Sequence, residues 1–200
     1  IVKIYFEEYL KNMENFVNLF MVGTNIGIEK NLDLMAISVE FLEKAVKVSK
    51  EEREKAEALN NLGNALYGWA ELIEGKETEE ARKKYERARE CFDKALEINP
   101  NHAEAWYNKG NVLYELGRYE EAIGCFDRAL EINQNYAEAW NNKGAVLYLL
   151  GRYEEALESK GKAAFLLCLG GRIDIAFEIF KEVYDKRLNI PICYECGVAL

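Results

Sequence analysis

The sequence predicts an all-α fold built from antiparallel helix pairs, and three observations lead to this prediction. A motif recurs at an interval of 34 residues along the chain. The apolar residues inside each repeat recur with the period of an α-helix. The composition is 50% hydrophobic with only two prolines, which argues against a disordered chain and against a turn-dense β fold.

The repeat is defined by matches that are all 34 residues apart. The matching segments are 103–106 (Ala-Glu-Ala-Trp) with 137–140, 117–122 (Gly-Arg-Tyr-Glu-Glu-Ala) with 151–156, and 91–99 with 125–133. Repeats of this length are typical of solenoids, in which each unit buries its apolar face against the next. The interval therefore indicates a row of similar units.

Each unit has the pattern of two helices joined by a turn. In the second unit, Trp106 and Gly110 lie on one stripe of a helix, and Ala122 and Phe126 lie on another after the break at 117–118. The small residues allow helix backbones to approach closely, while the aromatic rings fill the space between them. The spacing thus predicts one helical hairpin per unit.

This pattern resembles the tetratricopeptide-repeat family, whose units carry Trp and Gly in the first helix and Ala, Phe and Ala in the second. The matching residues are Leu59, Leu62, Gly63, Ala88, Phe92, Ala95 and Pro100 in the first unit, Trp106, Gly110, Ala122, Phe126 and Ala129 in the second, and Trp140, Gly144, Ala156 and Ala163 in the third. The resemblance covers roughly residues 56–169. It implies a right-handed superhelical solenoid with about three clear repeats, a divergent N-terminal helix pair and a C-terminal helix.

Two departures from the family pattern carry structural expectations. Tyr67 and Tyr85 are 18 positions apart, whereas the corresponding tyrosines of the second unit are 5 apart. The inserted stretch keeps a helical pattern, so we expect both helices of the first unit to run on, with Thr78 as an N-cap. Lys160 stands where the family has Phe, and Gly161 follows it. This weakens the second helix of the third unit, since an interior Gly costs about 1 kcal/mol relative to Ala.

The domain organisation is expected to comprise three segments. Residues 1–50 form a divergent helical pair that caps the stack, because the end units of a solenoid need atypical faces. Residues 51–187 form the repeat solenoid with its C-terminal helix, and residues 188–200 form a tail that carries a cysteine pair.

Composition and motifs argue against several classes of function. The formal net charge of −9 argues against a nucleic-acid binder, because phosphate contacts need clustered Lys and Arg. No run of 18 apolar residues marks a membrane span, and no secretory signal is recognised, so we expect a cytoplasmic protein. The single histidine, His102, lies at an expected helix start, and no catalytic or nucleotide-binding motif occurs. We therefore expect no enzyme activity and no cofactor.

One signal in the tail is compatible with metal binding. Cys193 and Cys196 have the spacing of half a tetrahedral zinc site. The chain contains no second such pair, so a free tail, a half-site completed from elsewhere and a redox pair remain open.

The resemblance also implies a concave groove lined by the first helices, in which family members bind extended peptides or helices. The matching positions are Glu57, Asn60, Asn61, Asn64, Tyr67, Glu104, Tyr107, Asn108, Asn111, Tyr114, Glu138, Asn141, Asn142 and Tyr148. An Asn amide both donates and accepts hydrogen bonds, so a row of them can pair with a peptide backbone. The glutamates favour a neutral or basic partner. A clamp for a C-terminal carboxylate is disfavoured, because Glu138 stands where that clamp has a cation.

The primary prediction is a non-catalytic protein-interaction scaffold that binds a partner segment in this groove. A second hypothesis is a self-assembly module, which pairs copies through the open end after residue 187 or through the aromatic side chains Tyr5, Phe6, Phe16 and Phe20. A third hypothesis is a regulatory or adaptor part of a larger, zinc-containing protein.

Overall fold

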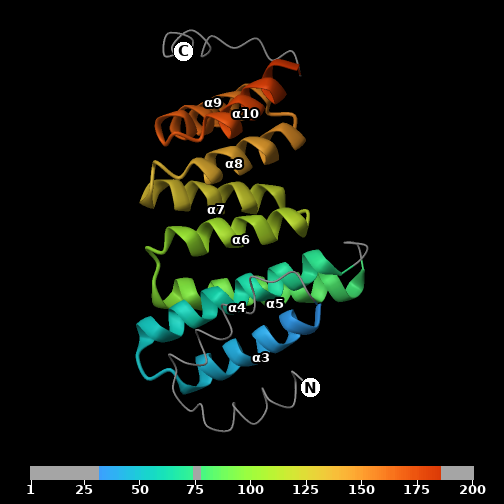
Figure 1. Cartoon of the computed structure of the whole chain (residues 1–200), viewed down its shortest axis with the longest axis vertical. Helices are drawn as coiled ribbons and strands as arrows, with labels where there is room; N and C mark the ends of the chain where they lie inside the picture. The colour runs from blue at the N-terminus through green and yellow to red at the C-terminus, as the bar shows by residue number, and fades with distance from the viewer. Residues whose placement is uncertain (1–31, 74–77, 186–200) are drawn as a thin grey trace. The chain divides into compact units, whose positions relative to one another are not determined.

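A computed structural model describes residues 32–73 and 78–185 of the chain. The regular structure in these ranges is α-helical, without a strand, which confirms the all-α prediction. The helices are α3 (Leu32–Val48), α4 (Glu52–Leu72), α5 (Glu79–Ile98), α6 (Ala103–Glu115), α7 (Tyr119–Ile132), α8 (Ala137–Leu149), α9 (Tyr153–Leu169) and α10 (Ile173–Asp185) (Figure 1). Their contacts define two compact units, of which the first contains α3 to α5 and the second contains α6 to α10.

In the first unit, α4 packs against both α3 and α5. α4 has 21 residues and α5 has 20, whereas α6 has 13 and α7 has 14. The prediction that both helices of the first repeat run on is therefore confirmed. Thr78 is the N-cap of α5 as expected, and its side-chain hydroxyl accepts a hydrogen bond of 3.2 Å from the backbone N–H of Ala81.

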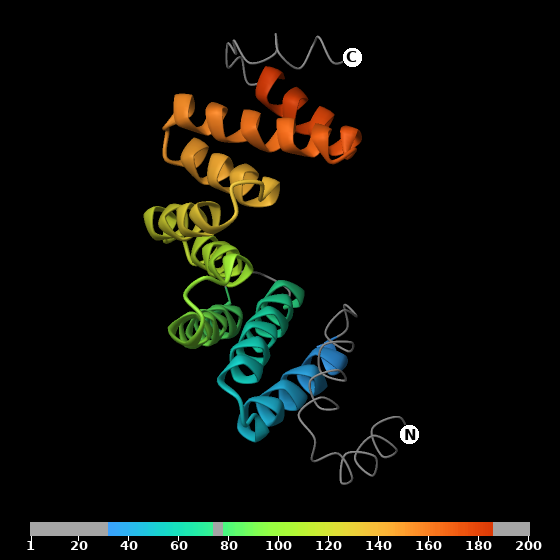
Figure 2. The ribbon, with the colours of Figure 1, turned by 90° about the vertical axis from the view of Figure 1, so that its left-hand side faces the viewer.

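In the second unit, each helix packs against the next helix along the chain, from α6 to α10 (Figure 2). α6 also contacts α8, so the first helices of two successive repeats lie side by side. This arrangement brings the polar residues of α6 and α8 to a common surface.

Three turns of the second unit are built in the same way. Gly117, Gly151 and Gly171 adopt positive φ angles of 73°, 74° and 75°, a conformation that glycine enters without steric cost. The arginine after each glycine donates its backbone N–H to a carbonyl five residues earlier; the bond from Arg118 to Leu113 is 2.8 Å long. This is the Schellman arrangement, which ends one helix at a defined residue. The next helix then begins directly after the arginine.

The helices of each hairpin approach closely where a glycine faces a large side chain. A Cβ atom added at Gly63 would lie 2.6 Å from the ring of Phe92, and one at Gly110 would lie 2.5 Å from the ring of Phe126. Both rings are fully buried. The Gly and Phe positions of the repeat therefore form a matched pair, because the ring fills the space that a side chain would take.

Replacing Gly110 by Ala is expected to destabilise the protein, although Ala favours a helix by about 1 kcal/mol over Gly. The new methyl group would collide with the buried ring of Phe126. Gly124 on α7 is the matched control, because it is exposed and a Cβ there meets nothing within 4 Å. Gly124→Ala should raise the free energy of unfolding by up to about 1 kcal/mol. Denaturant unfolding measures the free energy of unfolding of both variants. If this free energy changes in the same direction in both, the close packing of Gly110 against Phe126 is contradicted.

The third repeat uses Lys160 where the other repeats use Phe. A Cβ at Gly144 would lie 2.7 Å from Cγ of Lys160, so the aliphatic stem of the lysine takes the place of the ring. The ammonium group then reaches Glu182 on α10, with 2.7 Å between Nζ and Oε2. α9 continues without a break through Lys160 and Gly161, so the expected weakening does not interrupt the helix.

Several expectations fall outside the described residues. These are the aromatic first helix with Tyr5, Phe6, Phe16 and Phe20, and the tail with Cys193 and Cys196. In the part of the chain that the structure describes, no helix has the length and apolar character needed to cross a membrane. The expected segments 1–50, 51–187 and 188–200 stay predictions.

Candidate functional site

Five predicted site residues form one polar surface on α6 and α8. We call this surface the amide face, and it consists of Tyr107, Asn108, Asn111, Asn141 and Asn142. All five side chains are half-buried. They come together because residues three and four apart lie on one side of a helix and because α6 packs beside α8.

Asn142 is the centre of a hydrogen-bond network within the amide face. Its Nδ2 donates to Oη of Tyr107 at 3.1 Å and to Oδ1 of Asn111 at 2.8 Å. Its Oδ1 accepts a longer bond of 3.4 Å from Nδ2 of Asn141. Both amide hydrogens and the oxygen of Asn142 are thus engaged inside the protein. In this structure the residue joins two successive repeats, and a ligand would have to compete with these bonds.

Asn108 retains hydrogen-bonding capacity, whereas the unsatisfied oxygen of Asn141 is enclosed by the protein. Within the second unit, the amide of Asn108 has no hydrogen-bond partner, although it occupies the repeat position equivalent to Asn142. Oδ1 of Asn141 is buried and receives no hydrogen bond. A buried acceptor without a donor costs free energy, so this oxygen lowers the stability of the fold.

A cluster of tilted aromatic rings borders the amide face. The rings of Tyr107 and Tyr136 have centroids 4.8 Å apart, and the ring of Phe126 lies 6.0 Å from that of Tyr107. Burial raises the pKa of Tyr136 above its ordinary value, and the neighbouring Tyr107 and glutamates act in the same direction. Tyr136 therefore stays a neutral phenol at any physiological pH.

Three of the four tyrosines expected to line the groove pack against an equivalent residue in their own repeats. Each packs against the tyrosine on the second helix of its own hairpin, and the pairs are Tyr67 with Tyr85, Tyr114 with Tyr119, and Tyr148 with Tyr153. The ring centroids are 5.2 to 5.8 Å apart, which is the range of favourable aromatic pairs. These tyrosines contribute to the hairpin packing, and only part of each ring is available to a ligand.

The glutamates differ in their surroundings. Glu138 forms an ion pair with Arg172, and Glu57 lies 3.7 Å from Arg53. Glu104 is exposed and, among the described residues, has no ion-pair partner. Glu104 thus contributes the negative charge that is most available near the amide face.

The remaining predicted residues lie on α4 in the first unit. Asn61 and Asn64 are half-buried, whereas Asn60 is only 5% exposed. Asn60 occupies the repeat position of Asn141, and its Oδ1 is likewise buried without a hydrogen-bond partner. The same repeat position therefore carries an unsatisfied amide oxygen in both units.

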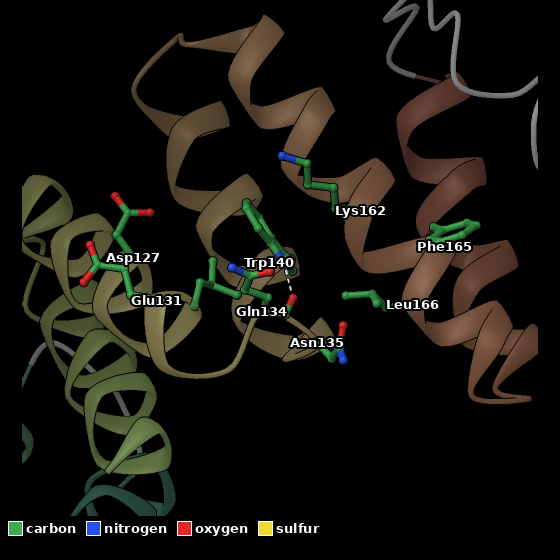
Figure 3. Close-up of a pocket in the computed structure, with 9 residues that line it drawn as sticks. Asp127, Glu131, Gln134, Asn135, Trp140, Lys162, Phe165 and Leu166 are labelled. Atoms are coloured by element: carbon green, nitrogen blue, oxygen red, sulfur yellow. Dashed lines mark hydrogen bonds between the residues drawn. The ribbon is translucent and has the colours of Figure 1, made fainter. Parts of the chain in front are cut away.

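A pocket of about 620 Å³ lies elsewhere on the second unit, between α7, α8 and α9 (Figure 3). We call it the Trp140 pocket. Its apolar side chains are Leu130, Trp140, Phe165 and Leu166. Asp127 and Glu131 on α7 lie on one side of the Trp140 ring, and Lys162 on α9 lies on the other, with Nζ 4.6 Å from the ring centroid. Sequence reasoning missed this pocket, because Trp140 matched a core position of the repeat.

The described residues carry few groups suited to catalysis or metal binding. No cluster of three or more His, Cys, Asp or Glu side chains that could hold a metal occurs among them. His102 acts as an N-cap, because its Nδ1 accepts a hydrogen bond of 3.2 Å from the N–H of Ala105. Burial raises the pKa of the Cys91 thiol to about 11, so this cysteine stays protonated at neutral pH and is a poor nucleophile.

The repeated hairpins and their identical turns define a helical-repeat protein. Models of the tetratricopeptide repeat match residues 79–117, 103–136 and 125–158. Residues 79–158 of the chain belong to the tetratricopeptide-repeat family. Membership supports a role as a protein-interaction scaffold, and proteins of this family are typically non-catalytic.

Comparison with solved structures supports the same fold. The crystal structure of MamA matches with a TM-score of 0.66 and 20% identity, over 86% of this chain and 89% of that chain. The MamA RS-1 ArsTM double mutant matches with a TM-score of 0.53 and 24% identity, over 76% of this chain and 84% of that chain. These similarities show the fold alone. A search of curated proteins finds no match.

Proposed function

We propose that the protein is a non-catalytic scaffold that binds an extended segment of a partner protein at the amide face. The observation that carries this proposal is the half-buried amide of Asn108, which lies beside the network of Asn142 and has no hydrogen-bond partner within its own unit. An amide in this position can donate to a peptide carbonyl and accept from a peptide N–H at once. Such pairing recognises the backbone of the ligand, so it tolerates variation in the ligand's side chains.

Oδ1 of Asn141 is itself enclosed by the protein, so Asn108 is the amide of this face that is offered to a peptide backbone. Asn142 contributes mainly by holding the two helices in register, since its hydrogen-bonding groups are already engaged.

The charge of the protein favours a neutral or basic partner. The chain has a formal net charge of −9, and the exposed Glu104 lies on the same helix as Asn108. A basic segment would be attracted over a distance comparable with the Debye length, which accelerates encounter more than it increases affinity. We therefore expect binding that weakens as salt is raised.

Replacing Asn108 by Ala is expected to weaken binding of a partner segment by about 5- to 50-fold, the effect of losing one or two hydrogen bonds. The partner is first captured from cell extract, and the bound segment is synthesised as a peptide for calorimetric titration. Gln134→Ala is the matched control, because it removes an exposed amide from the same unit at the Trp140 pocket. Equal affinities of wild type and Asn108→Ala would exclude the amide face as the binding site.

A further inference from the structure

The third repeat exposes a phenylalanine at a position where the other two repeats carry an acid. Phe165 on α9 occupies the repeat position of Glu131 and Glu97, because the three residues follow one another at intervals of 34. Both glutamates are exposed to solvent, and Phe165 is 47% exposed. The fold therefore requires no apolar side chain at this position, and the role of Phe165 has to be sought outside the packing of its own hairpin.

Phe165 forms one wall of the Trp140 pocket, so it is not an isolated apolar residue on the surface (Figure 3). The other apolar side chains of the pocket are Leu130, Trp140 and Leu166, and the four come from three different helices. The Trp140 ring is held in place, because its Nε1 donates a hydrogen bond of 3.0 Å to the backbone carbonyl of Gln134. A concave apolar site with a fixed ring loses little conformational freedom when a ligand enters.

The charged side chains that line the pocket are already paired within the second unit. The pairs are Asp127 with Lys143, Glu131 with Arg128, and Lys162 with Glu158. Three acids and three bases leave this site without net charge, although the whole chain has a formal net charge of −9. A charged ligand group would have to compete with one of these ion pairs, whereas an uncharged group leaves all of them in place.

Cations of the protein also occupy the surroundings of the Trp140 ring. Nζ of Lys162 lies 4.6 Å from the ring centroid, and Nζ of Lys143 lies 5.4 Å from it. The ring thus makes its cation–π contacts within the protein. A basic ligand group would meet two like charges at this ring, and an acidic one would meet Asp127 and Glu131 at the pocket edge. The pocket therefore selects an uncharged occupant, unlike the amide face, which favours a neutral or basic one.

We propose that the Trp140 pocket is a second protein-binding site, which holds uncharged Phe, Trp or Leu side chains of a partner segment. The scaffold family to which residues 79–158 belong supports a protein segment as the occupant. The exposed amides of Gln134 and Asn135 line the same pocket and can pair with the backbone of that segment.

The pocket and the amide face lie on different sides of α8. Trp140 and Asn142 are two positions apart on this helix, so their side chains point about 200° apart around its axis. One molecule can therefore hold one segment at the amide face and another in the pocket. Such a protein joins two partner segments, which goes beyond the binding of a single segment.

The test selects peptides against the purified full chain from a phage-displayed library of random peptides about a dozen residues long. Phe165→Glu is the test variant, because it restores the acid that the other two repeats carry at this position. Selected peptides are synthesised, and their affinities are measured by fluorescence polarisation. One group of peptides should bind Phe165→Glu at least about tenfold more weakly than the wild type, the loss expected for an interface anchor. The positions that these peptides share should carry Phe, Trp or Leu and no charged residue.

Two control variants locate the binding of this group. Phe177→Glu makes the same substitution at a phenylalanine that is 62% exposed on α10 and does not line the pocket, so it should bind these peptides like the wild type. Asn108→Ala should also bind them normally, which separates this proposal from the one for the amide face. Raising the salt concentration from about 50 to about 500 mM should change their affinity by less than about twofold, because no ionic contact forms.

Three results would overturn the proposal. A selection in which every peptide binds Phe165→Glu as tightly as the wild type would show that the pocket binds no segment. Equal losses for Phe165→Glu and Phe177→Glu would place the peptides on α10 instead. A charged residue shared by all peptides that respond to Phe165→Glu would show that the paired charges of the pocket do not exclude charged ligands.

Discussion

Phe126→Ala is expected to lower the free energy of unfolding by about 3–5 kcal/mol, the largest effect of any single substitution considered for this protein. The Phe126 side chain is fully buried on α7. It shares a core cluster with Leu113 of α6 and with Val146 and Leu147 of α8. One ring therefore joins two successive repeats, and its removal leaves a cavity that the rigid hairpins cannot close.

The measurement is denaturant unfolding followed by circular dichroism, with Phe165→Ala as control. Phe165 is of the same residue type but is 47% exposed, so its loss should change stability by less than about 1 kcal/mol. A second control tests the close approach itself. Gly110→Ala is destabilising in the wild type, but in a Phe126→Ala background the new methyl group has room and should stabilise. Additive effects of the two substitutions would contradict direct packing of residues 110 and 126.

Glu182→Ala is expected to lower the free energy of unfolding by about 1–3 kcal/mol. The Lys160 side chain is only 7% exposed and its ammonium group is held by Glu182, so loss of the carboxylate leaves a charge in a mostly buried place. The Glu182 side chain is 42% exposed, and partial screening by solvent makes the effect smaller than for a fully buried ion pair.

Lys160→Met provides the informative comparison. Methionine keeps an unbranched stem beside Gly144 and removes the charge, so this variant should match the wild type or exceed its stability by about 1 kcal/mol. In the Lys160→Met background, Glu182→Ala should have little further effect. Thermal unfolding of the four proteins gives the coupling energy of the pair. Equal losses for Glu182→Ala in both backgrounds would show that the ion pair contributes nothing.

The helices and their turns follow closely from local sequence. The 34-residue interval located the hairpins, the glycines at 117 and 151 located the turns, and Thr78 located the start of α5. These features depend on backbone preferences and on apolar periodicity, which act over a few residues. The third glycine turn, at Gly171, uses the same Gly-Arg motif before a helix that lies outside the clear repeats.

The sequence predicted which residues form the candidate site, but it did not predict which of them form hydrogen bonds with one another. Asn108 and Asn142 occupy equivalent repeat positions and have the same spacing to their neighbours. Only the structure shows that Asn142 is engaged by Tyr107 and Asn111, whereas Asn108 has no partner on the helices of its own unit. The difference arises because α8 packs beside α6 of the preceding repeat in the second unit. Identical residues in a repeat thus acquire different roles from the helix that faces them.

Sequence alone determined the repeat unit, its two helices, the polar character of their first helices and the acidic charge of the chain. These properties follow from residue identity and periodicity, which are local. Tertiary structure alone decided that Lys160 reaches Glu182 across 22 positions, that the amides of α6 and α8 pair with each other, and that a pocket forms beside Trp140. The physical reason is that a hydrogen bond or a cavity depends on the relative placement of two helices within a few ångströms, and side-chain packing between helices sets that placement.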